Sequence, residues 1–297
     1  MSRLTVLLTG ATGFIGSHLL EALLKQGYQM VILKRSTSNL CRIAHLERQY
    51  KSYDVDIQPI EQAFVEHQID CVIHTASHYG RNGNPISEIV ESNLMFGLRI
   101  LDTCLKFDVK TFINTDTFFN NPNFNQKYLG AYTMSKKHFV DWLQSYSVKF
   151  QVVNLKLQHV YGPKDDSSKF IPWFVSQLKQ KAKEIELTSG NQKRDFIFVE
   201  DVVSAYLTIL KNTSSISNFQ QFDVGTGESL KLSDFLNQLV DFYRDCHLTS
   251  KTTLVFGAKP EREGEIMDIE VDNSGLKRLG WEIRTTRLSA FEKLLEL

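Results

Sequence analysis

Close to its N-terminus the chain carries a short apolar run that breaks into a glycine-rich turn, Leu4-Thr-Val-Leu-Leu-Thr-Gly10-Ala-Thr-Gly13-Phe-Ile-Gly16. The run predicts a buried β-strand, and residues 17–25 have the apolar spacing of an amphipathic helix. In such a strand–turn–helix unit, the first glycine allows a tight turn and the second lets the backbone approach a pyrophosphate. The third lets the helix pack on the strand, so that its N-terminal N–H groups face the phosphates. The stretch therefore predicts a dinucleotide-binding unit rather than a merely structural turn.

Strand and helix patterns alternate through the first half of the chain. Helical periodicity covers 60–67, 85–107 and 130–148, and apolar runs predict strands at 29–33, 52–55, 70–74, 110–114 and 151–157. Such alternation is typical of a parallel sheet with helices on both faces, in which ligands bind at the carboxyl ends of the strands. We therefore expect an α/β fold built on a Rossmann-type, doubly wound parallel sheet.

The composition is that of an ordinary globular protein. Of the 297 residues, 42% are hydrophobic and 23% charged, and the formal net charge is zero, which gives no electrostatic reason to expect nucleic acid or an anionic membrane as a partner. No apolar run reaches the ~18 residues of a membrane span, and no signal-peptide pattern precedes the first strand. The four cysteines lack metal-ligand spacing, so we expect free thiols, no metal and a cytoplasmic location.

A tyrosine and a lysine stand four residues apart in Tyr132-Thr-Met-Ser-Lys136. On a helix over 130–148 they share one face, so the ammonium lies near the phenol and favours its anion. The pair is common by chance on helices. It gains weight from the glycine turn and from the triplet Thr115-Asp-Thr117, which follows the expected strand 110–114. Together these features predict a hydride-transfer active site.

With these motifs in order, the chain resembles the extended short-chain dehydrogenases/reductases, the family of nucleotide-sugar epimerases, dehydratases and reductases. The resemblance runs from Thr5 to Trp281. Beyond the glycine turn, Thr115, Tyr132 and Lys136, it rests on Val160-Tyr-Gly-Pro163, Arg194-Asp-Phe-Ile-Phe-Val-Glu-Asp201, Val224-Gly-Thr-Gly227 and Leu279-Gly-Trp281.

The resemblance implies a role for each matched position. Tyr132 would be the acid–base residue, Thr115 a hydrogen-bond partner of the reacting oxygen, and Lys136 both an activator of Tyr132 and a ligand of the cofactor ribose. Arg194 and Arg262 would lie near the diphosphate of the sugar nucleotide. The implied cofactor contacts also include Gly10, Thr12, Gly13, Phe14, Ile15, Gly16, Asp54, Val55, Thr75, Ala76, Ser77 and Asn93.

We expect two regions. Residues 1–157, with part of 194–226 returning to them, would bind the dinucleotide. Residues 158–193 and 227–297 would form a smaller C-terminal α/β region that binds the nucleotide sugar. The resemblance also suggests a homodimer through the helices near 85–107 and 130–148, although both helices would cover the sheet in a monomer as well.

Two departures from the family pattern narrow the chemistry. Sugar 4,6-dehydratases of this family carry Glu at the third position of the triplet, where this chain has Thr117. A hydroxyl cannot replace a carboxylate base, which argues against elimination. Where many members hold NAD through an acidic residue after the second strand, this chain has Lys34-Arg-Ser36. Cations and a hydroxyl suit a 2′-phosphate, which favours NADPH and a net reduction, unless these residues are only a solvated strand end.

Finer stretches resemble one branch of the family, the reductases that form CDP-3,6-dideoxyhexoses. They imply reduction of the C4 ketone of a CDP-linked keto-deoxysugar, CDP-4-keto-3,6-dideoxyglucose, for an O-antigen sugar. Asn114-Thr-Asp-Thr-Phe-Phe119 favours abequose over its C4 epimer paratose. The other matching stretches are Tyr79-Gly-Arg81, Leu155-Lys-Leu-Gln-His-Val-Tyr-Gly-Pro163, Lys169-Phe-Ile-Pro172, Thr188-Ser-Gly-Asn-Gln-Lys-Arg-Asp-Phe196 and Phe256-Gly-Ala258.

Several polar residues are further candidates for the site. His78, Tyr79 and Arg81 follow the expected strand 70–74 and would contact substrate, or else satisfy one another in a helix-entry loop. Asp116 and Thr117 would contact substrate, with capping of the next turn as the alternative for Asp116. His159 would contact cofactor or substrate, or be a packed core histidine. The Asn-rich stretch 118–129 would be a mobile flap or a solvated connection.

Two other functions remain open at this stage. An epimerase that retains NAD would use the same tyrosine, lysine and threonine. A non-catalytic dinucleotide sensor could share the fold, although such proteins usually lose the tyrosine–lysine pair that this chain keeps.

Overall fold

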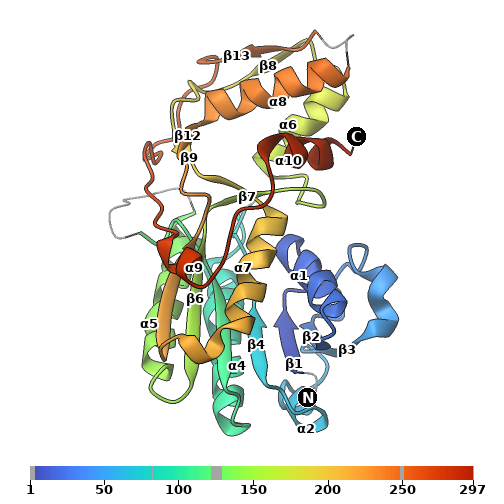
Figure 1. Ribbon diagram of the computed structural model, residues 1–297, viewed down its shortest axis with the longest axis vertical. Coiled ribbons are helices and arrows are strands. Elements are labelled where there is room, and N and C mark those ends of the chain that lie inside the picture. Colours follow the sequence, from blue (N-terminus) through green and yellow to red (C-terminus); the bar gives the residue numbers. More distant parts are fainter. Residues whose placement is uncertain (1–3, 82, 122–128, 248–250, 297) are drawn as a thin grey trace.

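The computed structural model describes residues 4–81, 83–121, 129–247 and 251–296. Its centre is a seven-stranded sheet in the order β11-β6-β5-β4-β1-β2-β3, in which every neighbouring pair is parallel (Figure 1). The strands are β1 (Thr5–Thr9), β2 (Gln29–Lys34), β3 (Tyr50–Asp54), β4 (Cys71–His74), β5 (Thr111–Thr117), β6 (Gln151–Leu157) and β11 (Phe219–Val224). The order reverses between β1 and β4, which is where a doubly wound sheet binds its ligand. The predicted Rossmann-type fold is confirmed.

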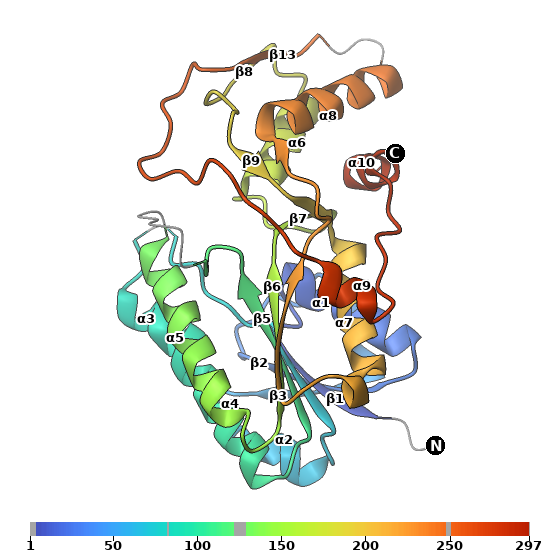
Figure 2. The same cartoon turned by 60° about the vertical axis from the view of Figure 1, so that its left-hand side comes forward.

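Helices cover both faces of this sheet (Figure 2). One face packs against α1 (Phe14–Lys25) and α7 (Val199–Lys211), whose leucines, valines and isoleucines form a core with the strands. The other face packs against α2 (Glu61–Glu66), α4 (Phe96–Lys106) and α5 (Gly130–Tyr146). The predicted helix 85–107 is one continuous rod made of α3 (Ile86–Val90), the π-turn η2 (Glu91–Met95) and α4. Two 3₁₀ turns, η1 (Ala44–Gln49) and η3 (Thr213–Ser215), complete this part of the fold.

One strand is longer than the sequence predicted. The expected strand 110–114 continues to Thr117, because Thr115 and Thr117 pair with Leu155 and Leu157 of β6. Thr115 therefore lies inside β5, and Thr117 is the residue at its carboxyl end.

A second, smaller layer lies above the carboxyl ends of the strands (Figure 1). Its hydrophobic core includes Phe174, Phe235 and Phe291, which are fully or almost fully buried. They come from α6 (Phe170–Lys179), α8 (Leu232–Cys246) and α10 (Arg287–Leu295). Three short strand pairs accompany this layer. β7 (His159–Tyr161) pairs with β10 (Phe196–Phe198), β9 (Lys193–Arg194) pairs with β12 (Leu230–Lys231), and β8 (Glu184–Glu186) pairs with β13 (Thr253–Val255) at the end farthest from the sheet (Figure 1).

The C-terminal part returns to the sheet before it ends in α10. Leu276 of α9 (Ser274–Arg278) and Trp281 are buried in the core beside α7. The Trp281 indole donates to the Asp201 carbonyl (3.1 Å) and to the Ser204 hydroxyl (2.8 Å). We propose that 274–281 belong with the sheet, and that the other boundaries lie near 157, 194 and 226 as expected from the sequence.

The cysteines are free thiols, and Cys71 and Cys104 are buried as the sequence suggested. Among the described residues, no helix combines the length and the apolar character that a bilayer span requires.

The carboxylate of Asp201 on α7 anchors the chain after Trp281. It accepts the backbone N–H groups of Arg284 (2.9 Å) and Thr285 (3.3 Å). Asp201→Ala should lower the free energy of unfolding by about 1–3 kcal/mol, because two partly buried donors lose their acceptor. Urea denaturation measures this loss. Glu200→Ala, which removes only an exposed ion pair with Lys293 from the same helix, should cost under about 1 kcal/mol. Equal losses in the two variants would contradict the anchoring role.

Candidate active site

The glycine turn lies at the point where the strand order reverses. Gly10 has a left-handed backbone (φ +69°), and a Cβ there would lie 2.6 Å from the Ala76 nitrogen. A Cβ on Gly16 would lie 2.1 Å from the Gly10 carbonyl oxygen. Helix α1 starts directly after Gly13, so the N–H groups of its first turn, from Phe14 onward, face the strand ends. Thr12 and Ile15 are half-buried on either side of Gly13 and Phe14. The backbone therefore fits a pyrophosphate, as the sequence indicated.

The ends of β2 and β3 hold the residues expected at the adenosine ribose. Lys34 pairs with Asp54 on the neighbouring strand, and only 12% of its side chain is exposed. Ser36 donates its N–H (2.8 Å) and its hydroxyl (2.6 Å) to Asp56, while the side chain of Arg35 is exposed. Two of the three residues expected to bind a 2′-phosphate are thus already engaged by carboxylates. Asp56 was missed from the sequence because it lies beyond β3 and meets Ser36 only when β2 and β3 pair.

The loop after β4 is fixed by buried hydrogen bonds. The Thr75 hydroxyl donates to the Thr9 carbonyl (2.8 Å), and the Ala76 N–H donates to the Thr9 hydroxyl (3.2 Å). Asn93 accepts from the His78 N–H (2.6 Å) and donates to the His78 carbonyl (2.9 Å) and to the Ser135 hydroxyl (3.0 Å). The Asn93 amide therefore connects this loop to α5.

Tyr132 and Lys136 lie one turn apart on α5, only 4% and 2% exposed. Burial, together with the nearby Tyr79 and Asp116, raises the pKa of the Tyr132 phenol well above its ordinary value, and the nearby hydroxyls of Thr117 and Ser77 lower it in part. The Lys136 ammonium donates to the Thr115 carbonyl at 2.5 Å. Burial lowers the pKa of Lys136, and the charge of Asp116 opposes that change.

The two threonines of β5 have different partners. The Thr115 hydroxyl lies 2.6 Å from the hydroxyl of Tyr206, a fully buried residue of α7. The hydroxyl that meets Tyr132 is that of Thr117. Because side chains alternate along a strand, Thr115 and Thr117 lie on the same face of β5, and Thr117 is the one nearer its carboxyl end.

Asp116 points to the opposite face of the sheet from the two threonines. One carboxylate oxygen accepts from Asn120 and Asn154, both at 3.1 Å, and the other is buried with no partner among the described residues. Burial raises the pKa of Asp116, while the Lys136 charge lowers it. Asp116 thus both fixes the following turn, through Asn120, and faces Lys136.

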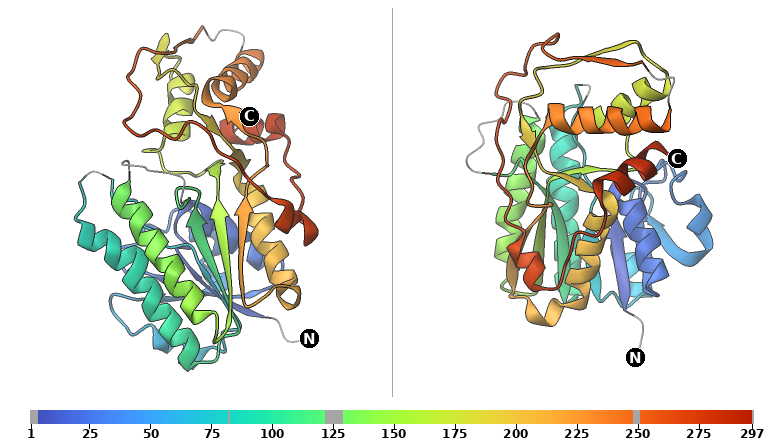
Figure 3. Two further views of the ribbon diagram at one scale, coloured as in Figure 1. Left: turned by 90° about the vertical axis from the view of Figure 1, so that its left-hand side faces the viewer. Right: turned by 45° about the horizontal axis from the view of Figure 1, so that its top comes forward.

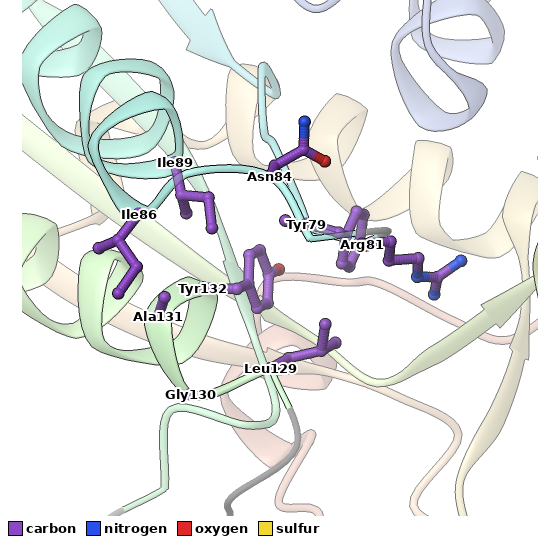
Figure 4. Close-up of a pocket in the computed structure, with 10 residues that line it drawn as sticks. Tyr79, Arg81, Asn84, Ile86, Ile89, Leu129, Gly130, Ala131 and Tyr132 are labelled. Carbon is purple, nitrogen blue, oxygen red and sulfur yellow. The ribbon is translucent and has the colours of Figure 1, made fainter.

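Tyr79 stacks on Tyr132, with ring centroids 4.7 Å apart and planes at 21° (Figure 4). The Arg81 guanidinium lies 5.2 Å from the Tyr79 ring centroid, and Arg81 donates to the Ser168 hydroxyl (3.4 Å). His78 is half-buried, and its Nδ1 has no partner among the described residues. A pocket of about 520 Å³ opens beside this stack, lined by Tyr79, Gly80, Arg81, Asn84, Ile86, Ile89, Leu129, Gly130, Ala131 and Tyr132. Most of the Asn-rich stretch 118–129, namely 122–128, falls outside the described residues.

His159 on β7 is packed against Phe118 (ring centroids 4.4 Å apart) and Phe196. Burial lowers its pKa well below the ordinary value, and the cations Arg194 and Lys169 lower it further. His159 is therefore a neutral imidazole at neutral pH. Its Nδ1 is buried and has no partner in the described part of the chain.

The second layer contributes two arginines. Arg194 pairs with Glu265 and donates to the carbonyls of Lys193 and Ile266, both at 2.6 Å. Burial lowers the pKa of Arg194, Glu265 raises it, and Arg262 lowers it, so the two arginines lie within electrostatic range of each other. Glu265 was not recognised from the sequence, because only the tertiary contact between β9 and the 261–266 segment pairs it with Arg194.

The structure thus brings Ser77, Tyr79, Asp116, Thr117, Tyr132 and Lys136 together at the carboxyl ends of β4 and β5. The ribose-binding candidates at 34–36 and 54–55 lie at the ends of the outer strands β2 and β3, and Arg194 and Arg262 lie in the second layer. The arrangement can bind a dinucleotide across the strand ends and place a buried phenol beside its far end.

Comparisons with known proteins show the family of the chain. Residues 6–225 match the NAD dependent epimerase/dehydratase family. The CDP-abequose synthase of Salmonella typhimurium is 36% identical over 293 residues, which cover 98% of this chain and 97% of that protein. The CDP-abequose synthase of Salmonella muenchen is also 36% identical, over 98% of this chain and 97% of its own length.

Solved structures share the fold. A UDP-glucose 4-epimerase from Thermotoga maritima, crystallised with UDP-glucose, superposes with a TM-score of 0.82 at 23% identity over 99% of this chain and 98% of the epimerase. The family match, the relatives and the sheet agree with one another: the chain belongs to the NAD-dependent epimerase/dehydratase family, the extended short-chain dehydrogenases/reductases, and its relatives act on nucleotide sugars.

Proposed function

We propose that the protein reduces the C4 ketone of CDP-4-keto-3,6-dideoxyglucose with NADPH and forms CDP-abequose, for O-antigen biosynthesis. The observation that carries this proposal is the Tyr132 phenol, which is buried at the carboxyl end of β5, one turn from Lys136 and stacked on Tyr79. The 36% identity to two CDP-abequose synthases over nearly the whole chain supports the substrate and the product.

The residues of the site fit a nicotinamide dinucleotide. The backbone around Gly10 and Gly16 leaves no room for a side chain. Because glycine has no Cβ, the backbone of the turn stays open to a pyrophosphate. When bound, the nicotinamide would supply the hydride that reduces the ketone carbon. Lys136 would bind the ribose that carries it.

Tyr132 acts as the general acid and donates its proton to the C4 oxygen as negative charge develops there. Thr117 hydrogen-bonds the same oxygen and stabilises that charge, in the role first expected of Thr115. Lys136 keeps a buried positive charge near the phenolate that forms. Burial of these groups excludes water, so each electrostatic contact is stronger than it would be in solvent.

Three other reactions have weaker support. Elimination needs a carboxylate where Thr117 stands. CDP-paratose formation differs only in the sugar face that meets the cofactor. An NAD-retaining 4-epimerase would use the same residues, and it would carry bound dinucleotide through purification and consume none. A non-catalytic sensor would not need the Tyr132 and Lys136 pair.

The preference for NADPH depends mainly on Arg35. Asp54 and Asp56 engage Lys34 and Ser36, so Arg35 is the exposed cation best placed for a 2′-phosphate. Lys34 adds positive charge at short range, while the pKa of the Asp56 carboxyl is lowered chiefly by its hydrogen bonds from Ser36.

We also propose a homodimer through the outer faces of α4 and α5, which run side by side along one flank (Figure 3). Large apolar side chains are exposed there, and an exposed row of this kind is typical of an interface. They are Leu105 on α4, Met134 and Trp142 on α5, and Ile86 and Met95 on α3 and η2, which precede α4 in the same rod.

Tyr132→Phe tests the acid. It should lower kcat by about 10²–10⁴-fold and leave cofactor affinity nearly unchanged, because it removes the proton donor and little contact area. The assay incubates CDP-4-keto-3,6-dideoxyglucose with NADPH, follows cofactor oxidation and determines the C4 configuration by NMR. Tyr146→Phe on the same helix, which removes a hydroxyl bonded to Asp102 at the surface, is the matched control. Turnover by Tyr132→Phe within a few-fold of the parent would remove Tyr132 as the acid.

Thr117→Val and Thr115→Val separate the two threonines. Thr117→Val should reduce kcat by about 10-fold or more, since a donor to the developing oxyanion is lost. Thr115→Val should mainly reduce stability, by about 1–3 kcal/mol, because the buried Tyr206 hydroxyl loses its partner. Steady-state kinetics and urea denaturation on both variants give the comparison. A larger kcat loss in Thr115→Val would return the catalytic role to Thr115.

Arg35→Gln tests the cofactor. If Arg35 binds the 2′-phosphate, the ratio of kcat/KM with NADPH to that with NADH should fall about 10–100-fold, the value of one charge-assisted hydrogen bond. Lys51→Gln, at an exposed position of β3, should leave the ratio unchanged. High salt should also shrink the parental preference, because the contact is exposed. An unchanged ratio in Arg35→Gln, or equal parental use of both cofactors, would show that residues 34–36 are only a solvated strand end.

A further inference from the structure

Lys169 of the second layer reaches Tyr79, the residue that stacks on Tyr132. Lys169 precedes α6, and its ammonium lies 5.5 Å from the ring centroid of Tyr79, the residue that stacks on Tyr132. The same ammonium lies 5.3 Å from the ring centroid of Phe14, the first residue of α1 after the glycine turn. Lys169 therefore contacts both the aromatic stack and the start of the dinucleotide-binding helix.

The side chain of Lys169 is held in place. Its ammonium pairs with Asp165 at 2.8 Å, and three quarters of the side chain is buried. Arg81 also connects the loop after β4 with the residues that precede α6, since its guanidinium lies over Tyr79 and donates to the Ser168 hydroxyl. Burial and Arg81 lower the pKa of Lys169, but Tyr79 and Asp165 raise it by more, so Lys169 keeps its charge through the neutral and mildly alkaline range.

The other charges around the stack come from several elements. Asp116 on β5 faces Tyr132 and also Lys136 on α5, and Asp165, Asp166 and Arg81 face Lys169. The neutral His159 is also within range of Lys169. Asp116 raises the pKa of Tyr132 and disfavours the phenolate, so a cation on the other side of the tyrosine pair would act in the opposite direction.

We propose that Lys169 is a positioning residue for Tyr132: through Tyr79 it holds the acid in its stack and brings a second buried positive charge to it. The inference rests on the proposed function, in that Tyr132 is taken as the acid. Since Lys169 comes from the second layer and Tyr132 from the first, the acid is complete only when the two layers are in contact. A cation–π contact is favourable, and more so when it is desolvated. The contact of Lys169 with Tyr79 therefore stabilises the association of the two layers.

The sign of the expected pH effect follows from the charge. A nearby cation stabilises the phenolate and lowers the pKa of Tyr132, which makes it a stronger acid. Without Lys169 the phenol should keep its proton to a higher pH but transfer it less readily. The alkaline limb of the pH profile for ketone reduction should therefore move to higher pH, while the plateau falls.

Lys169→Met tests the proposal, because it keeps the length and removes the charge. We expect kcat to fall about 10-fold and the alkaline limb to rise by about half to one pH unit. The KM of the nucleotide sugar and the Kd of NADPH should stay within about 3-fold. Lys169→Arg should restore most of kcat. Lys179→Met, on the same helix with an exposed ion pair to Glu296, should match the parent in every readout.

A second variant tests the same contact in case Lys169→Met does not fold. Tyr79→Leu should reproduce the shift of the limb, and adding Lys169→Met to it should have little further effect, since both changes break one chain of contacts. An unchanged limb and kcat in a folded Lys169→Met would overturn the proposal. So would an increase of 10-fold or more in KM or Kd at unchanged kcat, which would make Lys169 a phosphate ligand instead. Failure of the proposed function would be distinguishable from failure of this inference. It would appear as near-normal turnover by Tyr132→Phe, a variant in which Lys169 is intact.

Discussion

The close approach of two backbones at Gly10 and Gly16 is the constraint on which the rest of the structure depends. Helix α1 lies so near the end of β1 that a methyl group on Gly16 would overlap the Gly10 carbonyl, and one on Gly10 would overlap the start of the loop after β4. This packing brings the N-terminus of α1 and the ends of β1 and β4 to one place. The ligand-binding edge of the sheet, and the position of β5 and α5 beside it, follow from this geometry.

Electrostatics at the acid depends on a balance among buried groups. Tyr132, Lys136 and Asp116 are almost fully removed from water, and one carboxylate oxygen of Asp116 has no partner among the described residues. Burial favours the neutral phenol and the neutral amine, while Asp116 favours the charged lysine. Such a set is suited to a phenol that gives up its proton only as negative charge develops on the substrate oxygen. A nearby hydroxyl such as that of Thr117 would stabilise the developing charge.

The second layer has a core of its own and is also fixed to the sheet. Its Phe174, Phe235 and Phe291 core gives it a rigid body of its own, and Trp281 with Asp201 fixes the returning chain to the sheet. From this body Lys169 and Ser168 extend to Tyr79 and Arg81. The layers are therefore connected beside Tyr79, the residue that stacks on Tyr132.

The sequence by itself determined what depends on local spacing. The glycine turn, the alternation of strands and helices, the Tyr132–Lys136 pair and the family were all readable, because each is a pattern within one or two adjacent elements. Partners that come from distant segments were decided only by the tertiary structure. Pairing of β2 with β3 places Asp54 and Asp56 against Lys34 and Ser36, and pairing with β6 extends β5 to Thr117, which lies near Tyr132. Contact between the layers gives Arg194 its Glu265 and Tyr79 its Lys169. The physical reason is that a charge or a hydroxyl has a function only through its neighbours, and those neighbours are set by the packing of the whole chain.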